Sequence, residues 1–210
     1  MMNWNQLISA KRFGMEEFHE ERQENRSEFQ RDYDRLIFSA PFRRLQNKTQ
    51  VFPLPGSVFV HNRLTHSLEV ASVGRSLGDD VAKALLERHP ELQDSFLPEI
   101  GSIVSAACLA HDLGNPPFGH SGEKAISTFF SEGKGVRLKE KQPNGEQLSP
   151  MEWEDLTHFE GNANAFRILT HQFEGRRKGG FVLTYTTLAS IVKYPFSSSL
   201  AGSKSKFGFF

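Results

Sequence analysis

The feature that most constrains the fold is an almost continuous apolar segment, residues 103–110 (IVSAACLA), which runs directly into the polar string HDLGNPPFGH at residues 111–120. A helix that is apolar on nearly every face belongs in the centre of a helical bundle. Gly114 and the two prolines that follow end this helix, because glycine commonly closes a helix and proline does not continue one. His111 and Asp112 therefore lie at a buried helix end, where they require partners or a metal ion.

Helical periodicity elsewhere in the chain predicts an all-α fold without internal repeats. We expect a long helix from near residue 62 to near residue 89, with one buried apolar stripe. The residues of this expected stripe are Leu64, Leu68, Ala71, Leu77, Val81, Ala82 and Leu85. Further helices are expected at about residues 98–113, 121–133, 160–173 and 183–193.

Composition divides the chain into three parts. Residues 1–40 form a charged N-terminal arm and helix, residues 41–194 form the helical core, and residues 195–210 form an irregular tail. Within the core, residues 132–157 are polar and contain several glycines and prolines. This composition favours a surface insertion or loop.

Charge and cysteine content narrow the function classes. The 25 basic and 25 acidic residues cancel, so no global field draws the protein to nucleic acid or to a membrane surface. An anionic substrate must then be bound by a local cluster of charge. The single cysteine, Cys108, forms no intramolecular disulfide, which suits a reducing compartment. No segment approaches the roughly 20 apolar residues that cross a bilayer. We expect a cytoplasmic protein with no membrane partner.

Three segments carry side chains that can meet at the end of the apolar helix. His66 lies near the start of the expected long helix. His120 and Glu123 lie at the start of the helix expected after residues 111–120. Imidazole nitrogen and carboxylate oxygen are suitable ligands for a divalent metal ion. Each residue also has a purely structural interpretation. A His-Asp pair can cap a helix end, and a glutamate in a first helical turn is favoured by the helix dipole.

Five ordered blocks identify a family resemblance. They are RDYDRLIFSAPFRRLQNKTQV, NRLTHSLEVASVGRSLG, ACLAHDLGNPPFGHSGEKAI, FEGNANAFRILT and LTYTTLASIVKYP. The chain resembles the HD superfamily of metal-dependent phosphohydrolases, and within it the deoxyguanosinetriphosphate triphosphohydrolase branch. The resemblance covers most of the chain outside residues 132–157. It implies an all-α HD-domain helical bundle, with residues 41–194 as its catalytic core.

The resemblance implies roles for individual residues. His66, His111 and Asp112 would bind a divalent metal ion: magnesium, manganese or another transition metal. His120 and Glu123 would form the catalytic pair, and a histidine suits this role because imidazole titrates near neutral pH. The fourth metal ligand of the family, an aspartate on a later helix, has no counterpart that we identify. We therefore expect the family fold to be truncated before its C-terminal part, with the fourth ligand beyond this chain.

Substrate contacts are implied by the same resemblance. Gln50 would read the 3′-hydroxyl of the sugar, and Arg63 would contact a phosphate, for which the planar guanidinium is well matched. Glu160 and Asn162 would support the site by holding the directly acting side chains in position. Each of these four residues could instead be an ordinary polar residue of a loop, a surface or a helix terminus.

The expected function is metal-dependent hydrolysis of a deoxynucleoside triphosphate, with dGTP as the first candidate, to a deoxynucleoside and tripolyphosphate. The family also suggests a homo-oligomer such as a hexamer, with single-stranded nucleic acid as a further partner. Another HD-domain nucleotide phosphohydrolase is the nearest alternative. A non-catalytic nucleotide- or nucleic-acid-binding fragment and an inert helical fragment stay open, because the fourth ligand is missing.

Overall fold

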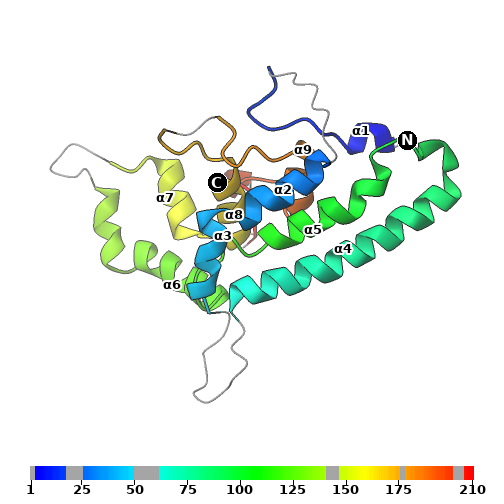
Figure 1. The fold of residues 1–210 in the computed structure, drawn as a ribbon. Coiled ribbons are helices and arrows are strands. Elements are labelled where there is room, and N and C mark those ends of the chain that lie inside the picture. The colour runs from blue at the N-terminus through cyan, green and yellow to red at the C-terminus, as the bar shows by residue number, and fades with distance from the viewer. Residues whose placement is uncertain (1–2, 18–25, 50–61, 141–146, 176–177, 201–205) are drawn as a thin grey trace, which may run out of the picture.

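The computed structural model describes residues 3–17, 26–49, 62–140, 147–175, 178–200 and 206–210. These residues form a helical fold, which confirms the expected all-α class (Figure 1). The α-helices are α1 (Trp4–Leu7), α2 (Glu28–Ile37), α3 (Ala40–Arg44), α4 (Arg63–Arg88), α5 (Ile100–Ala110), α6 (His120–Ser131), α7 (Pro150–Thr157), α8 (Gly161–Thr170) and α9 (Tyr185–Ile191). Short 3-10 turns are η1 (Leu45–Asn47), η2 (Pro90–Leu92), η3 (Leu97–Glu99), η4 (Lys134–Lys139) and η5 (Ser198–Leu200).

Helix α5 occupies the centre of the bundle, as its apolar sequence predicts. It packs against α2, α4 and α9, and Leu109 and Ala110 are fully buried. The core around it combines residues from segments far apart in the chain, which fixes the end of α5 in space. The buried apolar residues contributed by other elements include Leu36, Phe42, Leu45, Ala71, Ala165, Leu169, Leu183 and Leu188.

Helices α4 and α5 lie side by side in close contact (Figure 1). The buried face of α4 consists largely of small residues, among them Ala71, Gly74 and Gly78. A Cβ atom added at Gly74 would lie 2.7 Å from the Sγ of Cys108, and one added at Gly78 would lie 2.7 Å from the Cα of Gly101. The two helices approach so closely because these positions lack larger side chains.

The expected burial of Leu77 and Val81 in the stripe of α4 is wrong. Leu77 is 60% exposed and Val81 is 51% exposed, as is the neighbouring Val73 at 61%. Hydrophobicity alone predicted that the large apolar residues face the core. The close approach to α5 instead places the small residues of α4 in the interface, and turns the larger apolar residues outward.

The N-terminal segment is tied to the bundle by a buried arginine. Arg12 Nη1 donates hydrogen bonds to Asp32 Oδ1 at 2.7 Å and to the carbonyl oxygen of Val182 at 2.6 Å. Asp32 Oδ2 accepts hydrogen bonds from the backbone N–H of Thr184 at 3.0 Å and from its hydroxyl at 2.6 Å. Because Arg12 and Asp32 are both buried, this network fixes α2 against the segment before α9.

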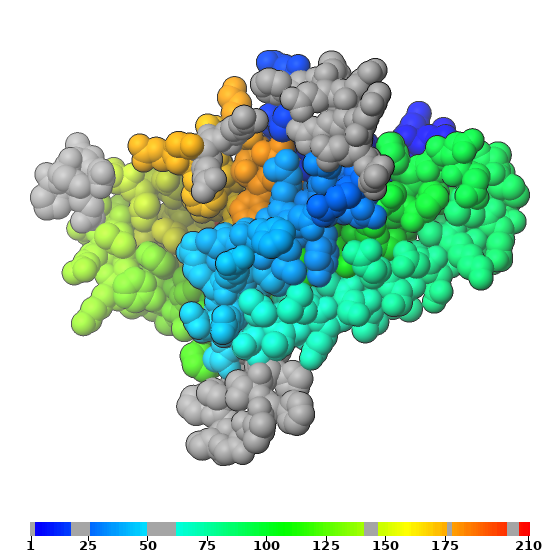
Figure 2. Space-filling view, viewed as in Figure 1, coloured from blue at the N-terminus to red at the C-terminus, as the bar shows by residue number. Residues whose placement is uncertain are grey.

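Helices α6 and α7 and the turn η4 form a lobe beside the bundle, here called the α6–α7 lobe (Figures 1 and 2). Helix α7 lies within residues 132–157, where the polar composition led us to expect a surface insertion or loop. Ser149 and Glu152 form a capping box at its start, with Pro150 in the first turn. This capping signal was readable in the sequence.

The last residues of the chain return to the bundle. Phe207 is buried and packs with Ala163 of α8, and Phe196 and Phe210 pack against this pair. The segment expected as an irregular tail therefore has an anchored end. Among the described residues, none of the helices combines the length and hydropathy that crossing a bilayer requires.

Candidate metal and catalytic site

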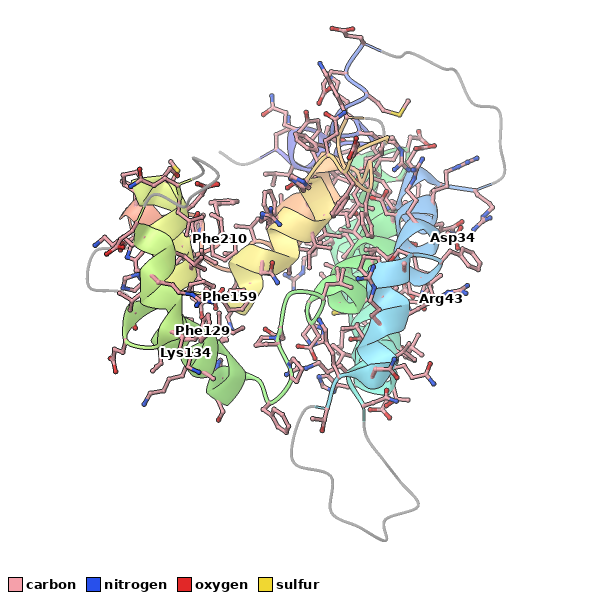
Figure 3. All side chains as sticks on the ribbon, turned by 90° about the vertical axis from the view of Figure 1, so that its left-hand side faces the viewer. Asp34, Arg43, Phe129, Lys134, Phe159 and Phe210 are labelled. Carbon is pink, nitrogen blue, oxygen red and sulfur yellow. The ribbon has the colours of Figure 1, made fainter. Side chains whose placement is uncertain are left out.

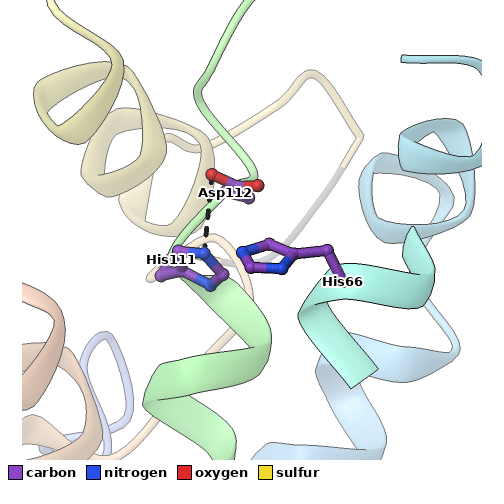
Figure 4. Close-up of side chains that lie close together, drawn as sticks. All are labelled: His66, His111 and Asp112. Carbon is purple, nitrogen blue, oxygen red and sulfur yellow. Dashed lines mark ion pairs between the residues drawn. The ribbon is translucent and has the colours of Figure 1, made fainter. Parts of the chain in front are cut away.

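Three side chains with metal-binding groups meet at the junction of α4 and α5. His66 lies in the first turn of α4, His111 follows the last residue of α5, and Asp112 is the next residue. Their candidate ligand atoms lie within 4.8 Å of one another (Figure 4). The structure thus brings together the three residues for which the sequence predicted a metal site, here called the metal triad.

The donor set of the metal triad fits a divalent first-row metal. Ligand bonds of about 2.1 Å place two ligand atoms at most about 4.2 Å apart, so small side-chain rotations suffice. His111 Nδ1 lies 2.6 Å from the carbonyl oxygen of Cys108, which requires the hydrogen on Nδ1. His111 Nε2 lies 3.5 Å from Asp112 Oδ1, and both atoms are of types that bind divalent metal ions.

Arg63 and Asn115 help to hold Asp112 in place. Arg63 Nη1 lies 2.8 Å from Asp112 Oδ2, and Asn115 Nδ2 donates a hydrogen bond to Asp112 Oδ1 at 2.5 Å. Arg63 and Asp112 are each only 4% exposed. The guanidinium for which we expected a phosphate contact therefore pairs with the carboxylate of the metal triad, and orients it.

Lys48 fastens the chain after η1 to the loop that follows Asp112. Its ammonium group donates hydrogen bonds to the carbonyl oxygens of Leu113 at 3.2 Å and Asn115 at 3.1 Å. Burial, and then the nearby charge of Arg63, lower the pKa of Lys48. These contacts make Lys48 a structural support of the loop.

His120 and Glu123 form a hydrogen-bonded pair in the first turn of α6. His120 Nδ1 lies 2.7 Å from Glu123 Oε2, and Glu123 Oε1 accepts the backbone N–H of Gly161 at 2.9 Å. Burial acts to raise the pKa of Glu123, but the hydrogen bonds from His120 and Gly161 and the charge of Lys206 hold this pKa below its usual value. The Glu123 side chain is 10% exposed and that of His120 is 85% exposed. A buried carboxylate thus holds an imidazole that faces outward.

The loop before α6 has an unusual backbone. Phe118 has φ 65°, although a side chain disfavours the left-handed region, and Gly119 has φ 55° and ψ −128°, which glycine alone adopts readily. Phe118 is also 47% exposed. Strained residues of this kind occur at functional sites. Here the strained turn leads directly into His120, the first residue of α6.

One cavity of about 560 Å³ is lined both by His111 of the metal triad and by the His120–Glu123 pair. Its polar lining includes His111 of the metal triad, His120, Glu123 and Asn162, and its apolar lining comes from α4, α5, α8 and α9. Small-molecule sites have volumes of roughly 300–1,000 Å³, so the cavity has room for a ligand of nucleotide size.

Residues 159–163 (FEGNA) lie at the start of α8, and Asn162 among them lines this cavity. Glu160, only 1% exposed, caps α8 by accepting the backbone N–H groups of Asn162 at 2.6 Å and Ala163 at 3.1 Å. A Cβ atom at Gly161 would lie 1.9 Å from Asn115 Oδ1, so glycine permits the start of α8 to approach the site. Asn162 lines the cavity, and the supporting role of Glu160 and Asn162 stays a prediction. Gln50 lies outside the described residues.

Sequence reasoning missed Lys206 as a site residue. Its ammonium group lies 3.2 Å from Glu123 Oε2 and 3.0 Å from Glu160 Oε1. The segment around it lacks regular periodicity, so no helical or strand pattern indicated its position. The adjacent FGFF string was the available signal, because aromatic residues at a chain end commonly pack onto a core.

A close backbone contact predicts a stability effect at Gly114. A Cβ atom there would lie 2.1 Å from both the backbone nitrogen of Ala165 and the carbonyl oxygen of Gly161. Gly114→Ala is therefore expected to lower the free energy of unfolding by about 1–3 kcal/mol, as measured by urea denaturation. Gly175→Asn is the matched control, because a Cβ atom at Gly175 would meet nothing within 4 Å and asparagine tolerates its φ of 72°. Equal losses in both variants would contradict the contact.

Comparison with known proteins places the chain in a family. The profile of the HD domain family matches residues 63–180, which include the metal triad, His120 and Glu123. The chain belongs to the HD-domain family, whose members form a superfamily of metal-dependent phosphohydrolases. This membership agrees with the observed helical fold.

Within this family, the chain is similar to proteins named for dGTP hydrolysis. It is 47% identical to a deoxyguanosinetriphosphate triphosphohydrolase-like protein of Synechocystis sp., over 100% of this chain and 48% of the relative. It is 38% identical to the like-named protein of Listeria monocytogenes, over 100% of this chain and 46% of the relative. A Yersinia enterocolitica deoxyguanosinetriphosphate triphosphohydrolase is 38% identical, over 92% of this chain and 41% of the relative. The chain spans about half the length of the curated relatives it matches.

Proposed function

We propose that this site serves the metal-dependent hydrolysis of a deoxynucleoside triphosphate, with dGTP as the first candidate, to a deoxynucleoside and tripolyphosphate. One observation carries the proposal: His111 of the metal triad and the His120–Glu123 pair line the same cavity of about 560 Å³. The names of the relatives support the choice of substrate class. The divalent ion would be magnesium, manganese or another transition metal, because two imidazoles and a carboxylate accept several of these ions.

In this proposal the metal triad binds the divalent ion, and the His120–Glu123 pair transfers a proton. A divalent ion held by the metal triad would supply Lewis-acid stabilisation of the charge that develops on the α-phosphate. Glu123 accepts the hydrogen of His120 Nδ1 at 2.7 Å, which leaves Nε2 of His120 available to the substrate. With a second proton on Nε2, His120 would give that proton to the departing 5′-oxygen as the bond between phosphorus and this oxygen breaks and the water oxygen bonds to phosphorus. A proton released by that water would then restore Nε2. Arg63 balances the charge of Asp112 and keeps its carboxylate oriented.

We further propose the location, oligomeric state and additional partner of the protein. We expect a cytoplasmic homo-oligomer, with a hexamer suggested by the family resemblance, and single-stranded nucleic acid as a further partner. Gln50 would read the sugar, and Arg63 would reach a phosphate only if the substrate approaches its pairing with Asp112. Size-exclusion chromatography with light scattering tests the oligomer, and titration with a labelled oligonucleotide tests the nucleic-acid partner.

Product analysis tests the proposed reaction. The parent chain and His111→Ala are incubated with Mn²⁺ and each deoxynucleoside triphosphate, and the released phosphates are separated by ion chromatography. We expect tripolyphosphate from the parent chain, most rapidly with dGTP, and none from the variant. Pyrophosphate or orthophosphate as the first product would instead favour another HD-domain nucleotide phosphohydrolase. Nucleotide binding without any product would favour a non-catalytic binding fragment.

A further inference from the structure

We propose that Lys206 is a positioning residue for the His120–Glu123 pair: its ammonium group fixes the Glu123 carboxylate between α6 and α8, so that His120 stays directed at the substrate. This inference rests on the function proposed for His120 and Glu123. The lysine itself acts through Glu123 and is not assigned a contact with the reacting atoms.

The contacts of Lys206 form a bridge between two buried carboxylates. Its Nζ atom lies 3.2 Å from Glu123 Oε2, 3.0 Å from Glu160 Oε1 and 3.4 Å from His120 Nδ1. Glu123 is 8% exposed and Glu160 is 1% exposed. Two carboxylates that approach one another in a buried region repel unless a cation lies between them. The ammonium group lies within 3.2 Å of both carboxylates and therefore offsets their repulsion.

Lys206 is delivered by an anchored segment. The next residue, Phe207, is buried against Ala163 of α8, and the Phe209 ring contacts Phe166 at a centroid distance of 4.9 Å. Phe210 lies beside Phe159, just before α8 (Figure 3). These aromatic contacts attach residues 207–210 to α8 and to the residue just before it. The position of the ammonium group is thus fixed by packing, in contrast to a free surface lysine.

The backbone near Gly208 strengthens this anchor. The N–H of Gly208 donates a hydrogen bond to the carbonyl oxygen of Phe196 at 3.0 Å. A Cβ atom at Gly208 would lie 2.0 Å from the carbonyl oxygen of Tyr194, so only glycine permits this approach. The segment that carries Lys206 is therefore fastened to α8 and to the chain that follows α9.

The electrostatic consequence follows from the groups that face Glu123. They are His120 on the same helix, Lys206 on the C-terminal segment and, across the ammonium group, Glu160 at the start of α8. Burial acts to lower the pKa of Lys206, but Glu160 and Glu123 raise it overall. Lys206 in turn helps to hold the pKa of Glu123 below its usual value. Loss of the ammonium group is thus expected to raise the pKa of Glu123.

Carbon-13 NMR of the side-chain carboxyl groups tests this expectation without requiring activity. The Glu123 resonance is identified by its absence from Glu123→Gln, and is titrated in the parent chain, Lys206→Met and Lys206→Arg. We expect a raised pKa of Glu123 in Lys206→Met and a low pKa in Lys206→Arg. Lys124→Met is the matched control, because Lys124 adjoins Glu123 in sequence but has an exposed side chain. If Lys206→Met does not fold, Lys206→Gln gives the same comparison.

Kinetics with the hydrolysed triphosphate provide the second readout. We expect Lys206→Met to lower kcat about tenfold with KM unchanged, a smaller effect than the roughly 10²–10⁴-fold loss expected when the acid itself is removed. Lys206→Arg should restore most of kcat. A raised KM with an unchanged Glu123 titration would make Lys206 a substrate ligand and overturn the inference. An inactive parent chain would count against the proposed function alone, since the titration still decides the role of Lys206.

Discussion

Replacing Asp112 with alanine is expected to abolish Mn²⁺ binding and to lower the free energy of unfolding by about 3–5 kcal/mol. The carboxylate belongs to the metal triad and also pairs with Arg63 Nη1 at 2.8 Å. Both residues are 4% exposed, so the variant leaves a buried guanidinium without its charged partner. Isothermal titration calorimetry with Mn²⁺ measures the first effect, and urea denaturation measures the second.

Two further variants separate metal binding from the ion pair. His66→Ala removes a ligand of the metal triad but no buried charge, so it should lose Mn²⁺ affinity with a smaller loss of stability. Asp112→Asn keeps an oxygen that can accept from Arg63, and should be more stable than Asp112→Ala. Undiminished Mn²⁺ affinity in Asp112→Ala would show that the three residues do not form the metal site.

Replacing His120 with alanine is expected to lower kcat by roughly 10²–10⁴-fold, the usual contribution of a positioned acid or base. Stability should change little, because the His120 side chain is 85% exposed. Mn²⁺ affinity should also be retained, since His120 does not belong to the metal triad. Steady-state kinetics, thermal unfolding and Mn²⁺ titration measure these three properties in the same preparation.

Glu123 provides the matched comparison for this variant. Glu123→Gln keeps the size of the side chain but removes the charge that holds His120 Nδ1, and should therefore lower kcat in the same direction. Full activity in both variants would exclude the His120–Glu123 pair from proton transfer. Loss of activity in Glu123→Gln alone would assign the catalytic role to the carboxylate.

The parts of the fold that depend on local sequence were predictable. The apolar run before His111 predicted a central helix, and α5 is that helix. Gly114 with the following prolines predicted an end near residue 113, whereas α5 ends at Ala110 and turns follow it. The approach of His66 to His111 was also expected, because each lies at a helix end and the family resemblance linked their segments. Their candidate ligand atoms indeed lie within 4.8 Å of each other.

Features that depend on contacts between distant segments were not predictable in the same way. The outward orientation of Leu77 follows from the close approach of α4 to α5, which its own hydrophobicity does not reveal. The pairing of Arg63 with Asp112 depends on two segments meeting at 2.8 Å. Lys206 reaches Glu123 across 83 positions of sequence, through an aromatic segment without helical periodicity. Helical patterns report which face is apolar, whereas these contacts depend on tertiary distances.

The glycines between α4 and α5 make the metal triad sensitive to changes far from it. A Cβ atom at Gly78 would lie 2.7 Å from the Cα of Gly101, and His66 lies about 18 Å further along the same helix. A side chain at Gly78 would push α4 away from α5 at this point. Because α4 is one continuous helix, His66 near its start would then move as well. Contact between the two backbones at Gly78 and Gly101 therefore limits how closely α4 and α5 approach at this point. A side chain at Gly78 is therefore expected to shift α4 and to change the geometry of the metal triad without contacting it.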